Sequence, residues 1–240
     1  MAEAVEGTAS EMDPQGVAIT YNGLGKMEAA AAAVSTHGWA GLAEAVGRTA
    51  SEMNPQNIAI TYNGLGKIEA AAAVSTPGWA GLAEAADKNA SEMNAQEVAI
   101  TFNALGKLEA AAAAVSPLGW AVLAEAVERT ASEMDPQEVA ITYDGSGKLE
   151  AAAAAVSSSG WVGLAEAVAR NASEMNEHEV SISLYALGVL PTAAAVLSPS
   201  TRKHLEAVVE REDPNMTAHG RKMTLRGCEK LKLRTPSAFL

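Results

Sequence analysis

The chain of 240 residues contains a single cysteine, Cys228, and only 4% aromatic residues. One cysteine forms neither an intramolecular disulfide framework nor a cysteine-based zinc cluster. The four histidines are scattered along the sequence, so we expect no metal site and no cofactor. No Ser-His-Asp or Cys-His arrangement is recognisable, which argues against an enzyme and against a small-molecule substrate.

Targeting segments and long apolar runs are also scarce. The N-terminus has neither the basic and apolar regions of a secretory signal nor an arginine-rich transit composition, so the compartment stays open. The longest uncharged apolar stretch is Val180–Thr201. Because it contains Pro191 and four serines, we interpret it as a buried helix rather than a membrane span, and expect no membrane partner.

Basic residues are few and unevenly placed in an acidic chain of net charge −12. Residues 1–200 hold 8 Lys+Arg against 24 Asp+Glu, whereas residues 201–240 hold 9 against 5. An acidic chain repels nucleic acid at long range, because affinity for phosphate grows with the number of neutralising cations. The acidic balance therefore favours basic partners.

An internal repeat is the main signal in the sequence. Ser-Glu-Met recurs at 10–12, 51–53, 91–93, 132–134 and 173–175, with offsets of 41, 40, 41 and 41 residues. Trp39, Trp79, Trp120 and Trp161 recur on the same period. A fixed period in the range of 20–50 residues is typical of a solenoid, in which each unit is stable only when stacked on its neighbours.

Each unit is predicted to contain two helices. Helix A of the second copy covers Trp39–Met53, whose apolar residues recur every three or four positions. Helix B begins at Pro55 after the N-cap Asn54 and continues through the alanine run, and Asn94 and Asp135 begin capping boxes. The predicted fold is a right-handed, all-α solenoid of about five two-helix repeats of 40–41 residues plus a degenerate terminal unit.

Packing is expected along one stripe of helix B, formed by Ile58, Tyr62 and Leu65, with the tryptophan of each unit as an anchor between neighbours. Glycines repeat inside helix B, as at Gly64 and Gly66. Each costs about 1 kcal/mol relative to alanine, so their recurrence indicates close helix–helix contact.

Two regions are predicted. Residues 1–200 form the repeat array, whose first unit is truncated because Met1 aligns with Leu42. Residues 201–240 form a degenerate, basic sixth repeat or cap, in which Arg202 replaces the tryptophan and Pro214 interrupts helix A. We expect this unit to be loosely packed and frayed.

The segment MNPQNIAITYNGLGK from Met53 to Lys67, preceded by GWAGLAEAVGRTASE, resembles the helical-hairpin repeats of octotricopeptide-type proteins, which are relatives of RAP-domain and FAST-kinase-like proteins. The specific part of the resemblance is EMNPQNIAIT, from Glu52 to Thr61. The resemblance covers residues 1–200. It implies an α-solenoid that binds organellar RNA, in a chloroplast or mitochondrion, for RNA processing or stability.

Candidate RNA-binding residues follow from spacing on helix B. Gln56, Ile60, Asn63 and Lys67 are four, three and four residues apart, and so share one face opposite the apolar stripe. Amides read base edges and lysines contact phosphates. The candidates for single-stranded RNA are Asn22, Lys26, Asn63, Lys67, Asn103, Lys107, Asp144, Lys148, Tyr185 and Arg226. Tyr21, Tyr62, Phe102 and Tyr143 fall on the apolar stripe, where core packing is the favoured role over base stacking.

Alternatives remain open at this point. One alternative interpretation is that the same face is simply solvated, and another is that it belongs to an armadillo- or HEAT-like scaffold that recognises a basic protein partner. A truncated repeat fragment without independent function is a third interpretation. The sign of the charge on the groove with the lysines separates the first two functions, since a positive groove favours RNA and an acidic one favours a basic protein.

Overall fold

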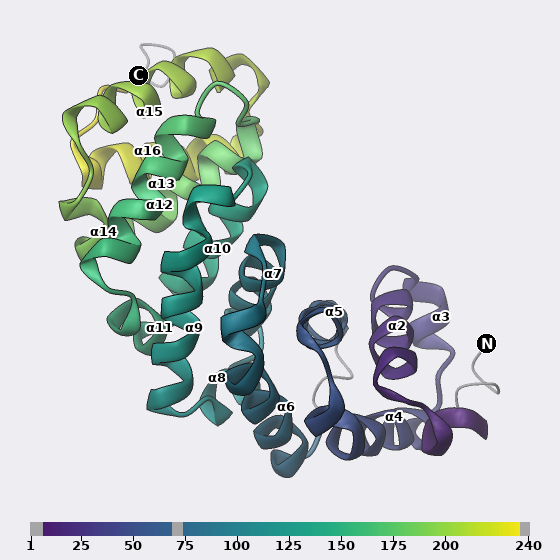
Figure 1. Cartoon of the computed structure of the whole chain (residues 1–240). Helices are drawn as coiled ribbons and strands as arrows, with labels where there is room; N and C mark the ends of the chain where they lie inside the picture. Colours follow the sequence, from purple (N-terminus) through teal and green to yellow (C-terminus); the bar gives the residue numbers. More distant parts are fainter. Residues whose placement is uncertain (1–6, 69–73, 236–240) are drawn as a thin grey trace. The chain divides into compact units, whose positions relative to one another are not determined.

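The computed structural model describes residues 7–68 and 74–235, and all regular secondary structure within those ranges is helical (Figure 1). The chain divides into two compact units, Met1–Leu123 and Ala124–Leu240, and helix α9 (Pro117–Thr130) spans the boundary. Within the described ranges, no helix is both long enough and apolar enough to cross a membrane. The prediction of an all-helical chain is confirmed.

The first unit alternates A helices, 3-10 turns, B helices and short third helices. Its A helices are α4 (Thr36–Thr49) and α6 (Thr76–Asn89), and its 3-10 turns are η1 (Ala9–Glu11), η2 (Ala50–Glu52) and η4 (Ala90–Glu92). Its B helices are α2 (Pro14–Leu24), α5 (Pro55–Leu65) and α7 (Ala95–Leu105), and its short helices are α3 (Glu28–Ala32) and α8 (Glu109–Ala114). Helix α4 packs on α6, while α5 packs between α2 and α7, so A and B helices form separate layers.

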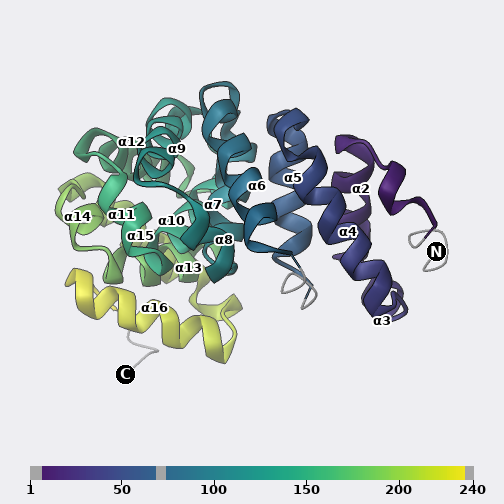
Figure 2. The same cartoon turned by 90° about the horizontal axis from the view of Figure 1, so that it is seen from below.

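The second unit repeats this order. It contains η5 (Ala131–Glu133), α10 (Pro136–Lys148), α11 (Glu150–Ala155), α12 (Ser158–Asn171), α13 (Glu177–Val189), α14 (Pro191–Ala195), α15 (Pro199–Glu212), η6 (Asp213–Asn215) and α16 (Ala218–Leu231). The A helices α12 and α15 pack together, and the B helix α13 packs between α10 and α16. Figure 2 shows α16, in yellow, alongside α13.

Each B helix begins at a side-chain cap. Asp13 Oδ1 accepts a hydrogen bond from the Gly16 N–H at 2.7 Å, and Asn54 caps α5 in the same way. Both predicted capping boxes, at Asn94 and Asp135, are confirmed. Because these caps satisfy N–H groups that have no partner inside the helix, the change of direction after each A helix is fixed locally.

The prediction that helix B continues through the alanine run is wrong. Helices α2, α5 and α7 end at a leucine followed by a C-cap glycine, and the alanine runs of the first and third repeats form separate helices, α3 and α8. Between them the backbone leaves the helical region, at Met27 (φ −125°, ψ 80°) and Leu108 (φ −115°, ψ 81°). The C-cap glycine has low helix propensity and favours ending the helix at this point, whereas α10 continues through Gly145 and Gly147 to Lys148. The corresponding run of the second repeat, 69–73, lies outside the described residues.

The predicted core stripe is confirmed, since Ile58, Tyr62 and Leu65 are all 0% exposed. Trp79, Trp120 and Trp161 are buried as predicted, whereas Trp39 is half-buried. The tryptophans link repeats. In the second unit the rings of Tyr143 (α10) and Trp161 (α12) stack with centroids 6.0 Å apart.

Close helix contact at a repeated glycine is also confirmed for Gly64. A Cβ built on Gly64 would lie 2.4 Å from the Tyr21 carbonyl carbon, so α2 and α5 approach to a distance that leaves no room for a side chain. In the second unit, a Cβ on Gly227 would lie 2.4 Å from the Leu184 oxygen. The B helices therefore pack backbone to backbone at these two junctions.

A contact that the sequence analysis missed also joins successive repeats. The Arg48 guanidinium of α4 donates to the carbonyl oxygens of Ala9 and Met12, at 3.0 and 3.1 Å. Arg170 makes the same two contacts three repeats later, to Ala131 and Met134 at 3.2 and 3.3 Å. Each arginine thus satisfies carbonyl groups at the 3-10 turn of the preceding repeat.

The sixth repeat differs from the expected loose, frayed unit. Pro214 does not interrupt helix A, because it lies in η6, where the other repeats also have a 3-10 turn. The Arg202 guanidinium, at the tryptophan position, donates to the Leu231 carbonyl oxygen at 2.6 Å and so joins α15 to the end of α16. Leu205 and Cys228 are fully buried, and both helices pack on the preceding repeat. A domain boundary at residue 200 stays a prediction.

Candidate nucleic-acid interface

The predicted site residues of the first unit lie along one face of the B helices, here called the B face. The asparagines come from the last turn of each helix, and the lysines follow the C-cap glycine. Asn22, Asn63 and Asn103 are half-buried, and Lys26, Lys67 and Lys107 are exposed. A lysine at a helix C-terminus is stabilised by the helix dipole, which is a structural role that binding does not exclude.

Adjacent repeats bring these side chains together. Asn63 Nδ2 donates to Asn22 Oδ1 at 3.4 Å across the α2–α5 junction. A Cβ on Gly25 would lie 3.1 Å from the Gly64 oxygen and 3.2 Å from the Lys67 Cβ, so the ends of the two helices are in contact. The first two copies of the amide and lysine rows are therefore continuous.

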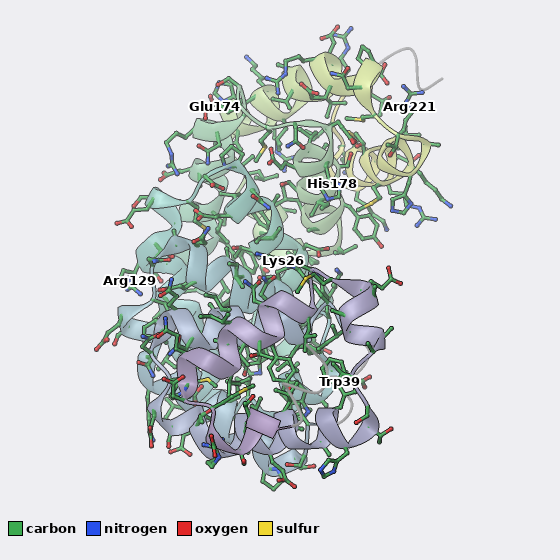
Figure 3. All side chains as sticks on the ribbon, turned by 90° about the vertical axis from the view of Figure 1, so that its right-hand side faces the viewer. Lys26, Trp39, Arg129, Glu174, His178 and Arg221 are labelled. Carbon is green, nitrogen blue, oxygen red and sulfur yellow. The ribbon has the colours of Figure 1, made fainter. Side chains whose placement is uncertain are left out.

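A hollow of about 890 Å³ opens at these helix ends. Lys26 and Lys67 line it together with Glu28 and the half-buried Trp39, and Figure 3 labels Lys26 and Trp39. A second hollow, of about 430 Å³, occupies the corresponding position in the second unit, between the ends of α10 and α13. Sequence reasoning missed both, because they form at the turn after helix B that it did not predict.

The charge on the B face differs from that of the chain. Helices α2 and α5 contain no acidic residue, and α7 contains only Glu97, which is held in its capping box. Exposed glutamates of the first unit lie on the A helices, as at Glu44 and Glu84, and also on the short third helices, at Glu28 and Glu109. Neither Lys26 nor Lys67 forms an ion pair with any side chain that the structure describes, whereas Lys88 on α6 pairs with Glu84 at 2.8 Å.

In the second unit, other residue types replace asparagine at the equivalent positions. Asp144 stands at the asparagine position, and its carboxylate binds Lys148 Nζ at 2.6 Å, so that lysine's charge is compensated. The row continues with the half-buried Tyr185 on α13 and the exposed Arg226 on α16. The structure therefore gives the two units different surfaces at equivalent positions.

The aromatic residues of helix B are core residues, as predicted. Tyr21, Tyr62, Phe102 and Tyr143 are at most 1% exposed. Burial raises the pKa of the three tyrosines above its ordinary value, because the phenolate is poorly solvated inside the protein. Base stacking on these rings is excluded in this conformation.

Isoleucines interrupt the polar B face. Ile19 is 58% exposed at the first helix, and Ile60 and Ile100 are half-buried at the next two. They lie one helical turn before the asparagines, so an apolar row runs beside the amide row. The face therefore presents apolar, amide and cationic groups in parallel.

Potential metal ligands are scattered among the described residues. None of them form a cluster of three or more His, Cys, Asp or Glu side chains that could hold a metal ion. Cys228 is buried, and burial together with Glu206 raises the pKa of its thiol to about 11, so little of it is the nucleophilic thiolate at neutral pH.

Comparison with known families identifies the repeat but not its role. Residues 41–61, 82–102 and 121–142 match a family described as "Protein of unknown function (DUF1601)". Each match starts within helix A and ends within helix B of one repeat, so three successive repeats carry the same family pattern. No curated protein matches the chain.

Proposed function

We propose that the B face of the first unit binds single-stranded RNA. The observation that carries the proposal is the charge separation: in a chain of net charge −12, α2 and α5 contain no acidic residue and are each followed by an exposed lysine. A locally positive surface on an acidic protein attracts phosphates at short range while the rest of the surface repels them.

The amide row supports recognition of an extended polymer. Asn22 and Asn63 adjoin, and consecutive B helices lie about 10 Å apart, so polar groups recur at regular intervals along the face. Because the tyrosines are buried, binding relies on phosphate contacts and amide hydrogen bonds rather than stacking. Such binding is sequence-tolerant and weakens with salt.

The finer architecture belongs to the same proposal. We infer a right-handed solenoid of about five A–B repeats and a terminal sixth, in which the B helices line the inner surface. The resemblance of Glu52–Thr61 to octotricopeptide-type repeats supports both this architecture and an RNA ligand.

A second candidate function is binding of an extended peptide of a protein partner. The isoleucine row favours it, because Ile19, Ile60 and Ile100 offer apolar contacts beside amides that can pair with a peptide backbone. Pull-down from native extract, with and without ribonuclease, separates the two: an RNA-binding protein loses its co-purified material after ribonuclease treatment, and a peptide-binding scaffold retains it.

The direct experiment measures affinity for a fluorescent oligouridine of about 20 nucleotides by anisotropy. K67E removes a lysine of the B face, and K88E makes the same charge change on α6, where Lys88 is paired with Glu84. We expect K67E to weaken binding several-fold and K88E to leave it close to the parent. Equal affinities of all three proteins would refute the proposed face.

A further inference from the structure

Successive repeats are joined in the A layer by an arginine clamp, which is defined here as the arginine near the end of helix A that donates to carbonyl oxygens of the preceding repeat. Arg48 and Arg170 each donate two such hydrogen bonds. Arg211 on α15 donates three. Hydrogen bonds from a charged donor stabilise a contact more than neutral ones do, so the clamp strengthens the junction between two repeats.

The junction between the second and third repeats has a lysine at the clamp position. Lys88 of α6 binds Glu84 of its own helix at 2.8 Å. An ammonium is a compact point charge and lacks the fork of N–H donors with which a guanidinium binds two carbonyl oxygens at once. The Met53 carbonyl oxygen of the second repeat accepts instead from Asn89 Nδ2, at 3.3 Å. A neutral donor thus stands where the clamp has a charged one.

The B layer is wider at the same junction. In the first junction, a Cβ built on Gly25 of the first repeat would lie 3.1 Å from the Gly64 oxygen of α5. In the second junction, a Cβ built on the equivalent Gly66 would lie 3.7 Å from Ala104 of α7, which replaces the close-packing glycine. The contact between the second and third repeats is therefore weaker in one layer and wider in the other.

Junctions of unequal strength have a consequence for how a stacked array opens. Each repeat contacts only its neighbours, so the stability of the array is approximately a sum of repeat and junction contributions. Partly open states are then most populated where the junction contribution is smallest. The first junction has the arginine clamp and the close glycine contact together, whereas the second has neither.

We propose that the junction between the second and third repeats is a hinge of the first unit, at which α2, α4 and α5 open together from α6 and α7. Asn63 and Asn103 lie on opposite sides of this junction, so opening interrupts the B face between them. The hinge goes beyond the proposed RNA binding, because contacts between repeats create it and no ligand is needed for it to open.

Hydrogen–deuterium exchange of the whole chain at low urea, read by mass spectrometry, tests the hinge. Peptides from α2, α4 and α5 should exchange through one shared opening and faster than peptides from α10 and α13. K88R supplies the missing guanidinium. It should slow exchange in α2, α4 and α5 about tenfold and leave α10 and α13 unchanged.

Two control variants separate the clamp from other effects. K203R makes the same change at the exposed Lys203 of α15 and should leave exchange in the first unit unaltered. R211K removes a clamp of the second unit and should speed exchange in α15 and α16 about tenfold. Simple fraying from the N-terminus predicts that α2 exchanges ahead of α5 without a response to K88R. That pattern would overturn the proposal, as would parental exchange in α5 as slow as in α10, or unchanged exchange in K88R or R211K.

Discussion

The Gly64→Ala substitution tests the close packing of the B helices. At the α2–α5 junction, a Cβ on Gly64 would lie 2.4, 2.6 and 2.7 Å from backbone atoms of Tyr21 and Asn22. Backbone atoms cannot rotate away as a flexible side chain does, so one helix must move relative to the other.

The magnitude follows from two opposing terms. Overpacking a close contact costs about 1–3 kcal/mol. Alanine in a helix is worth about 1 kcal/mol over glycine, which offsets part of that cost. At the α5–α7 junction Ala104 lies 3.7 Å from a Cβ built on Gly66, so a wider helix spacing that accepts alanine exists in the same unit. We therefore expect a net loss of up to about 2 kcal/mol in unfolding free energy.

Urea unfolding followed by circular dichroism measures this loss, and hydrogen exchange locates it. Protection should fall in α2 and α5, because those helices separate. The matched control is G47A, since Gly47 is exposed and its Cβ would meet nothing closer than the Gly78 Cα at 3.6 Å. We expect G47A to gain up to about 1 kcal/mol. A G64A protein as stable as G47A would refute the backbone-to-backbone packing.

Three further predictions address single side chains. R170A should lose about 1–2 kcal/mol of unfolding free energy in urea titrations, because two carbonyl oxygens lose a charged donor; an unchanged midpoint would show that the contact contributes nothing. Desolvation raises the pKa of Asp87, so the parent loses stability as pH rises from about 3.8 through the folded-state pKa. D87N lacks this loss, so its stability relative to the parent should grow between about pH 3 and about pH 7, and a constant difference would contradict the assignment. Cys228 should react with a thiol reagent at about pH 8 far faster in denaturant than in native buffer, and equal rates would show that it is not buried.

Features set by neighbouring residues could be predicted from the sequence. The caps at Asn94 and Asp135 depend on side chains three residues apart, and the stripe of Ile58, Tyr62 and Leu65 depends on helical spacing alone. Because the same pattern recurs every 40–41 residues, the stacking of similar helices could be predicted as well.

Features set by contacts between residues far apart in the sequence could not be predicted. Arg170 reaches carbonyl groups 36 and 39 residues earlier, and nothing in its local sequence distinguishes it from a solvated helix-end arginine. Helix α5 ends at Leu65, and in the first and third repeats the alanine run forms a separate short helix. Alanine has high helix propensity, so the sequence predicted a continuous helix instead. The repeated glycines have two different roles. Gly64 allows close contact between helices, and Gly66 is the C-cap at the end of α5.

The asparagines of the candidate face lie on the B helices, whereas Lys26, Lys67 and Lys107 follow the C-cap glycines, and binding by this face stays a prediction. Spacing put Asn63 and Lys67 on one face, and only the folded chain shows Asn63 in contact with Asn22.

The dependence of RNA affinity on salt tests the central claim most directly. For single strands the slope of log K against log salt concentration is about −0.7 per neutralised phosphate, so Lys26, Lys67 and Lys107 together predict a slope of about −2. K67E should reduce its magnitude by about 0.7, and K88E should leave it unchanged. A parent slope near zero, or the same slope for K67E and the parent, would contradict RNA binding on the B face.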